Sequence, residues 1–178
     1  SATLSAEAFF HAGGETLFST PEPMTPQYQD YYNRYVSAWT VVFPQDWDYG
    51  QRFPDLPFYF VADGCFLEEA RKDLSSGETL DHRGSISDRF PDGYVPGAQL
   101  EELMAQYFGL SAQEVRNWAG SAYDAVSGQY YLPGGYGGAY PYCQVEAARE
   151  DGDRLELDCA WYSAVDNAPL ERCTITLE

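Results

Sequence analysis

The chain has 178 residues, 44% of them hydrophobic and 16% aromatic, and its 28 acidic residues outnumber 10 basic ones. This composition is typical of a folded globular protein and excludes intrinsic disorder over most of the length. The acidity is global, with 14 acidic residues in each of the segments 1–90 and 91–178. A surface of that sign repels phosphate backbones and anionic lipid, so we expect no nucleic-acid partner.

No segment provides the run of about 20 apolar residues that crosses a bilayer, which argues against direct membrane insertion. The first 17 residues also lack the basic and then apolar pattern of a secretion signal. We therefore expect a mature region from which an anchoring N-terminal segment has been removed. The number and placement of the cysteines, together with the acidity and the aromatic richness, predict an extracellular or cell-surface location. The length predicts a single domain over residues 1–178.

The N-terminal part, residues 1–90, is predicted to be largely irregular or decorated. Glycines and prolines interrupt residues 1–24, and then Thr25 as N-cap and Pro26 at the first helical position predict a helix. Aromatic and apolar residues recur along it at helical spacing, which predicts a stripe that packs on a core: Tyr28, Tyr31, Tyr32, Tyr35, Val36 and Trp39.

The next segments are rich in turn signals. Residues 44–57 contain three prolines and are predicted to form a loop. The apolar run 58–62 ends at Asp63 and Gly64, a pair that favours a hairpin turn into Cys65; a helix over residues 66–74 is the alternative. Residues 75–97 are rich in Ser, Gly, Asp and Pro and are predicted to form a long connection.

Residues 95–118 give the clearest helical signal. One apolar face leads to Gly109, which should end the first helix, and Ser111 with Glu114 forms a capping box that opens a second. The rhythm is that of a helix-turn-helix. However, residues 95–125 hold four acidic residues against Arg116 alone, which argues against binding in a DNA groove and favours two helices packed on a sheet.

From residue 129 the period changes to two, which predicts an antiparallel meander through residue 178. The expected inward positions are all odd-numbered: Cys143, Val145, Ala147, Leu155, Leu157, Cys159, Trp161, Cys173, Ile175 and Leu177. Pairing odd with odd requires a hairpin loop of odd length, such as residues 150–152. We therefore predict an α+β fold, with helices packed on one face of a twisted antiparallel sheet, in an arrangement similar to cystatin or NTF2-like folds.

Three cysteines should thus enter one core. The four cysteines, Cys65, Cys143, Cys159 and Cys173, are candidates for disulfides or buried thiols, and three connectivities are open. Their spacing lacks the C-x2-C pattern of zinc sites, so we expect no metal and no cofactor. A Cys65 nucleophile with His82 as its base is an alternative that requires spatial contact between them.

The glycine-rich segment 132–142 carries several tyrosines and leads into a strand, which excludes a phosphate loop. One interpretation is a wide turn. The other is a loop whose flat rings bind a sugar or an extended peptide, because aromatic rings give contact area at low entropy cost. The candidate ligand-binding residues are Tyr130, Tyr136, Tyr140 and Tyr142. Asp46, Asp48 and Gly50 hint at a calcium loop, but Gln51 and Pro57 break its pattern.

About half of the chain carries a resemblance. It consists of the Val95 and Pro96 entry, the helix to Tyr107 and Phe108, the capped second helix to Trp118, and tyrosines before the glycine-rich segment. This run resembles the globular domains of uncharacterised exported lipoproteins from Gram-positive gut bacteria. The resemblance implies a surface location and an auxiliary, noncatalytic role, and residues 1–90 lie outside it.

These observations lead to two hypotheses about function. The first is a noncatalytic extracellular or surface-anchored module that binds an envelope or host glycan or protein through exposed tyrosines. The second is a cell-envelope hydrolase that uses a carboxylate pair or Cys65. The absence of a G-x-S-x-G or H-E-x-x-H motif favours the first.

Overall fold

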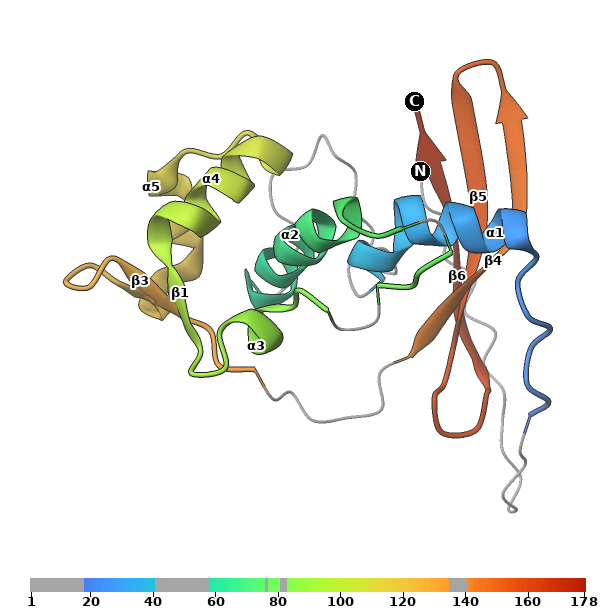
Figure 1. The fold of residues 1–178 in the computed structure, drawn as a ribbon, viewed down its shortest axis with the longest axis horizontal. Helices are drawn as coiled ribbons and strands as arrows, with labels where there is room; N and C mark the ends of the chain where they lie inside the picture. Colours follow the sequence, from blue (N-terminus) through green and yellow to red (C-terminus); the bar gives the residue numbers. More distant parts are fainter. Residues whose placement is uncertain (1–17, 41–57, 76, 81–82, 135–140) are drawn as a thin grey trace. The chain divides into compact units, whose positions relative to one another are not determined.

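The structure is a computed structural model, and it describes residues 18–40, 58–75, 77–80, 83–134 and 141–178. The described residues divide into two compact units (Figure 1). We call residues 18–40 with 141–178 the sheet unit, and the described residues between 58 and 134 the helical unit. Both contain helices or helical turns and antiparallel strands, which confirms the predicted α+β class. The single domain over residues 1–178 stays a prediction.

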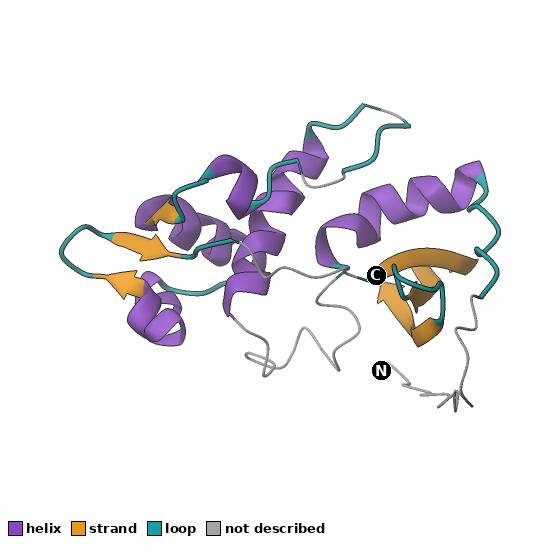
Figure 2. Cartoon of the chain, turned by 90° about the horizontal axis from the view of Figure 1, so that it is seen from below, coloured by secondary structure: helices purple, strands orange, loops and turns teal. Residues whose placement is uncertain are grey.

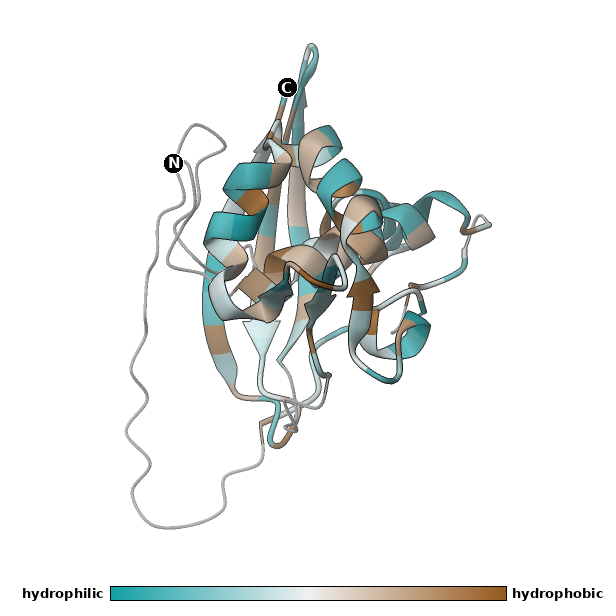
Figure 3. Cartoon of the chain, turned by 90° about the vertical axis from the view of Figure 1, so that its left-hand side faces the viewer, coloured by the Kyte–Doolittle hydropathy of each residue, from teal (hydrophilic) through white to brown (hydrophobic). Residues whose placement is uncertain are grey.

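The sheet unit contains the expected C-terminal meander. Its strands are β4 (Tyr142–Asp151), β5 (Arg154–Tyr162) and β6 (Pro169–Leu177), in the order β4-β5-β6. A helical segment crosses one face of this sheet: α1 (Pro26–Tyr31), the π-turn η1 (Tyr32–Val36) and the 3-10 turn η2 (Ser37–Trp39) (Figures 1 and 2). The turn that joins β4 to β5 is hydrophilic (Figure 3).

The start of α1 and its aromatic stripe are confirmed. The Thr25 hydroxyl accepts a hydrogen bond from the Tyr28 amide, and Pro26 occupies the first turn. Four tyrosines of the stripe pack against the buried sheet face: Tyr28, Tyr31, Tyr32 and Tyr35. Most stability of so short a helix comes from this packing and not from intrinsic helix propensity.

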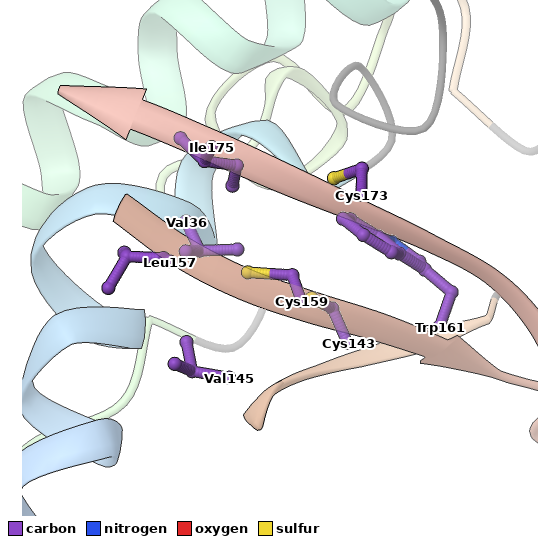
Figure 4. Packing of buried hydrophobic residues seen from close by; sticks show 8 residues of the cluster. All are labelled: Val36, Cys143, Val145, Leu157, Cys159, Trp161, Cys173 and Ile175. Carbon is purple, nitrogen blue, oxygen red and sulfur yellow. The ribbon is translucent and has the colours of Figure 1, made fainter. Parts of the chain in front are cut away.

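The buried face of the sheet gathers the three predicted cysteines (Figure 4). Its core consists of Val36, Cys143, Val145, Leu157, Cys159, Trp161, Cys173 and Ile175. The indole nitrogen of Trp161 donates a hydrogen bond to the Thr40 carbonyl at 2.8 Å, so the one polar atom of that ring is satisfied. The predicted convergence of the three thiols on one core is confirmed.

The predicted odd-length loop is wrong. Asp151 pairs with Arg154, and Gly152 at φ +62° opens a two-residue turn. A β-bulge between Val145 and Ala147 adds one residue to β4 and restores the pairing of core with core farther from the turn. Ala147 is therefore opposite Asp158, and its neighbour Ala148 packs against the core instead.

The helical unit begins with α2 (Phe58–Lys72), so the hairpin turn at Asp63 and Gly64 is wrong and the alternative helix began too late. The Asp63 carboxylate accepts a hydrogen bond from the Ile86 amide at 2.6 Å, so this side chain bonds a segment that is distant in the sequence. Ile86 starts the short helix α3 (Ile86–Arg89), capped by Ser85, within the segment predicted as a connection.

The two helices expected within residues 95–118 are confirmed. Helix α4 (Gly97–Phe108) ends at Gly109, whose φ of +64° is the left-handed conformation that glycine adopts without strain. Helix α5 (Ala112–Ala119) starts with both hydrogen bonds of the Ser111 and Glu114 capping box, and the 3-10 turn η3 (Gly120–Ala122) follows it.

A second antiparallel sheet belongs to the helical unit. It consists of β1 (Tyr94–Pro96), β3 (Gln129–Tyr131) and β2 (Tyr123–Asp124), in the order β1-β3-β2. The meander therefore does not begin at residue 129, because β3 pairs back with β1 and β2. Helices α4 and α5 belong to the same unit as this small sheet, whereas α1 and η1 pack against the C-terminal sheet. The prediction that all helices pack on one sheet is therefore wrong.

Candidate functional site

Two exposed tyrosines lie side by side on the small sheet of the helical unit. Tyr94 of β1 pairs directly with Tyr131 of β3, and their ring centroids are 5.0 Å apart with an interplanar angle of 39°. The two residues are 48% and 49% exposed, which is unusual for rings that bury much apolar area when they pack. The pair forms an aromatic surface open to solvent.

The alternation of the strands explains why these rings face outward. Their neighbours Val95 and Tyr130 point to the opposite face and are fully buried. The Tyr130 ring stacks on Phe58 of α2 at 5.8 Å, and its hydroxyl donates to Glu101 of α4 at 2.9 Å. The inner face thus fixes the sheet against α2 and α4.

A polar row lies beside the tyrosine pair on the same face, because Pro96 pairs with Gln129 and Gln129 pairs with Asp124. The Asp124 carboxylate accepts hydrogen bonds from the Ser127 hydroxyl at 2.7 Å and the Val126 amide at 2.9 Å. These bonds lower the pKa of Asp124, so it carries a charge at neutral pH. We call Tyr94, Pro96, Asp124, Gln129 and Tyr131 the outer face.

Gly93 makes the packing next to the outer face feasible. Its φ of +81° is favourable only for glycine, and an added Cβ would lie 3.0 Å from the Pro133 Cα and 3.2 Å from the Tyr131 ring. The amide of Tyr94 donates to the Asp92 carboxylate at 3.1 Å, which holds the entry to β1. Gly93 therefore allows the chain just before β1 to pack closely against Tyr131 of β3 and against Pro133, which follows β3.

A polar cavity of about 650 Å³ lies elsewhere in the helical unit. It is lined by Glu69, Ala70, Lys72, Asp73, Gly84, Arg89, Gln99, Glu102, Leu103 and Gln106. Glu69 accepts hydrogen bonds from Lys72 and from the Tyr107 hydroxyl. The hydrogen bond between Lys72 and Glu69 raises the pKa of Lys72 to about 12. Charges of both signs line the cavity, and Lys72 forms an ion pair with Glu69 there at 2.7 Å.

The structure separates the predicted ligand-binding tyrosines. Tyr130 is buried, so its prediction as an exposed ligand contact is wrong. Tyr142 belongs to the sheet unit, where its ring stacks on Tyr162 at 5.6 Å and its hydroxyl donates to Asn167 at 2.7 Å. Tyr136 and Tyr140 lie outside the described residues. Sequence reasoning missed Tyr94, and period-two alternation around Val95 and Tyr130 was the signal that could have found the pair.

Cys65 is not suited to nucleophilic chemistry. It is fully buried in α2, and its thiol donates to the Met104 sulfur at 3.9 Å. Burial raises its pKa far above the ordinary range, so the reactive thiolate is negligible at neutral pH. His82 lies outside the described residues. The cysteine version of the hydrolase hypothesis loses its chemical basis.

Four cysteines are free thiols, and all four are buried. Among the described residues, no group of three or more His, Cys, Asp or Glu side chains is arranged to hold a metal ion. No helix within the described ranges is long and apolar enough to cross a bilayer. The residues of the hinted calcium loop, Asp46, Asp48 and Gly50, lie outside those ranges.

Comparison of the chain with family models, curated proteins and solved structures found no match. The outer face and the cavity are therefore interpreted from their own chemistry.

Proposed function

We propose that this chain is a noncatalytic extracellular or surface-anchored module that binds a glycan of the cell envelope or of a host through its outer face. The observation that carries the proposal is the exposed pair of Tyr94 and Tyr131. The side-chain amide of Gln129 and the carboxylate of Asp124 lie beside this pair on the same face. Proteins seldom leave two large neighbouring rings half exposed without a use, and aromatic residues are enriched at binding surfaces.

The chemistry of the outer face fits a sugar. A tyrosine ring has a flat apolar face that can cover the C–H face of a pyranose, and it loses little rotamer freedom on binding. The Gln129 amide both donates and accepts hydrogen bonds, and the charged Asp124 accepts them. These are the partners that sugar hydroxyls require at the rim of an aromatic contact.

The charge of the chain narrows the class of glycan. The formal net charge is −18 at pH 7, and Asp124 adds a local negative charge to the outer face. Phosphate-bearing or carboxylate-bearing polymers would be repelled. We therefore propose neutral or amino-bearing glycans as ligands. The export of the chain and its attachment to a surface belong to the same proposal, because such glycans are exposed outside the cell.

Binding to a panel of neutral, amino-bearing and anionic oligosaccharides, measured by isothermal titration calorimetry, tests the proposal. Tyr94→Ala and Tyr131→Ala should each weaken binding about tenfold, since a lost ring contact of roughly 1–1.5 kcal/mol corresponds to that change. Leu170→Ala is the control, because Leu170 is 42% exposed and belongs to the sheet unit.

Two results would contradict the proposal. One is the absence of binding to any member of the panel, and the other is binding that both tyrosine variants leave unchanged. Release of shortened oligosaccharide by the wild-type chain would instead support the hydrolase that uses a carboxylate pair.

A further inference from the structure

The buried face of the C-terminal sheet brings three thiols together. Cys159 of the central strand β5 is directly opposite Cys173 of β6, and Cys143 of β4 lies two pairs along the ladder, opposite Trp161 (Figure 4). We call Cys143, Cys159 and Cys173 the thiol cluster. None of the three is used by the proposed glycan site, which belongs to the helical unit.

The two neighbours of Cys159 differ in their backbone geometry. Residues directly opposite on antiparallel strands have Cα atoms about 4.5–5.5 Å apart, within the range of about 4.4–6.8 Å that a disulfide spans. Diagonal neighbours such as Cys143 and Cys159 have Cα atoms typically about 7–8 Å apart, at or beyond that limit, so the side-chain hydrogen bond between the Cys143 and Cys159 thiols does not by itself place their backbones within disulfide range. Rotation about χ1 can turn two opposed thiols toward each other, whereas shortening a diagonal requires the backbone to move.

We propose that Cys159 and Cys173 are a redox-sensitive pair that a small external disulfide converts into a cross-strand disulfide, leaving Cys143 and Cys65 as thiols. The proposal is independent of the glycan-binding function. It assigns a modification site to a core that is otherwise apolar, and the bond joins β5 to β6 across the final hairpin.

The reaction with oxidised glutathione proceeds in two exchanges. The Cys173 thiolate attacks one glutathione sulfur, which forms a mixed disulfide and releases one glutathione thiolate. The Cys159 thiolate then attacks the Cys173 sulfur, forms the intramolecular bond and releases the second glutathione. The protein loses two protons and two electrons, and glutathione disulfide gains them as two thiols.

The exposure of the thiols supports this order. Cys173 lies on an edge strand and is 6% exposed, whereas Cys159 lies on the central strand and is 1% exposed. Burial raises the pKa of Cys173 to about 12, so little thiolate forms at neutral pH in the folded chain. Oxidation should accordingly be slow in the native state and faster while the chain refolds from urea.

Tryptic mapping tests the proposal directly, because trypsin places each cysteine on a separate peptide: residues 53–71, 117–149, 155–172 and 173–178. The chain is refolded from urea with oxidised glutathione, its free thiols are alkylated, and the digest is analysed by mass spectrometry without reduction. We expect peptide 155–172 linked to peptide 173–178. Peptides 53–71 and 117–149 should carry the alkyl label, so two of four thiols are lost.

Variants separate this pairing from the alternatives. Cys143→Ser and the control Cys65→Ser should retain the linked pair, and Cys173→Ser should abolish it. A link between peptides 117–149 and 155–172 in the wild-type chain, or four labelled cysteines after refolding with oxidant, would overturn the proposal. The wild-type map alone decides between these outcomes, so the result does not depend on whether each variant folds.

Discussion

The hydrogen bonds of Glu101 allow a quantitative test of the inner face of the small sheet. The Glu101 side chain is 11% exposed and accepts hydrogen bonds from Arg116 at 2.7 Å and 3.1 Å and from Tyr130 at 2.9 Å. Burial raises the pKa of Glu101, but the bonds from Arg116 and Tyr130 outweigh burial and leave the pKa lowered. Glu101 is therefore charged at neutral pH.

Glu101→Ala should leave the buried Tyr130 hydroxyl without its acceptor. An unsatisfied buried hydroxyl costs about 1–3 kcal/mol, and the partly exposed pair with Arg116 adds only about 0–1 kcal/mol because solvent screens it. We expect the free energy of unfolding to fall by about 2–3 kcal/mol. Adding Tyr130→Phe removes the unsatisfied donor, so the double variant should recover roughly 1–2 kcal/mol.

Urea unfolding followed by circular dichroism at 222 nm measures these changes, because α2, α4 and α5 all belong to the helical unit. Glu102→Ala is the matched control, since Glu102 is the exposed neighbour of Glu101 on α4, and it should change stability by less than about 0.5 kcal/mol. If Tyr130→Phe destabilises the Glu101→Ala chain as much as it destabilises the wild type, the loss of Glu101 does not leave the Tyr130 hydroxyl unsatisfied.

Two further predictions concern the sheet unit. Leu157→Ala, at a fully buried core position, should cost about 2–5 kcal/mol in urea unfolding, whereas Leu170→Ala at an exposed position should cost little; equal costs would contradict the assigned core. Hydrogen bonds from Arg149 lower the pKa of Asp158 below 3.8, so its stabilisation is present above that pH and is lost as the pH falls through the folded-state pKa. Asp158→Asn should therefore lower the urea midpoint at pH 7 and reduce its loss as the pH falls below 3.8; parallel pH curves would refute this.

Local signals in the sequence predicted much of the fold. Thr25, Gly109 and the Ser111 cap each act within one helical turn, so a short window contains all the information they need. The register of the C-terminal sheet was harder, because the β-bulge after Val145 compensates for a turn at Gly152 that lies several residues away. Alternation alone fixes which residues share a face, and it does not reveal where an extra residue enters.

The helix through Asp63 and Gly64 shows a second limit. A short window favours a turn there, but the apolar face of α2 continues through that pair to Cys65 and Phe66, both fully buried. The Asp63 carboxylate accepts a hydrogen bond from the Ile86 amide, 23 residues farther along the chain. Tertiary packing therefore overrides local turn propensity, and no sequence window of turn length contains the residue that decides the outcome.

Identifying the candidate site required knowing which of two adjacent tyrosines faces the solvent. Tyr130 and Tyr131 are adjacent, yet one is fully buried and the other is half exposed, because successive residues of a strand face opposite sides. Composition identified the tyrosine-rich region, and the pairing of β1 with β3 was needed to show that Tyr94, and not Tyr130, is the partner of Tyr131 on the solvent side.

The two proposals concern different units and opposite kinds of sheet face, one buried and one exposed. They can therefore be tested independently. In the sheet unit the thiol cluster occupies the buried face, where it can affect ligands only through stability. In the helical unit the tyrosine pair occupies the exposed face, where its loss removes contacts but little packing. Tyrosine variants should therefore leave the tryptic disulfide map unchanged, and Cys173→Ser should leave glycan affinity unchanged wherever the chain is folded. A coupled response would mean that the two units do not act as separate compact bodies.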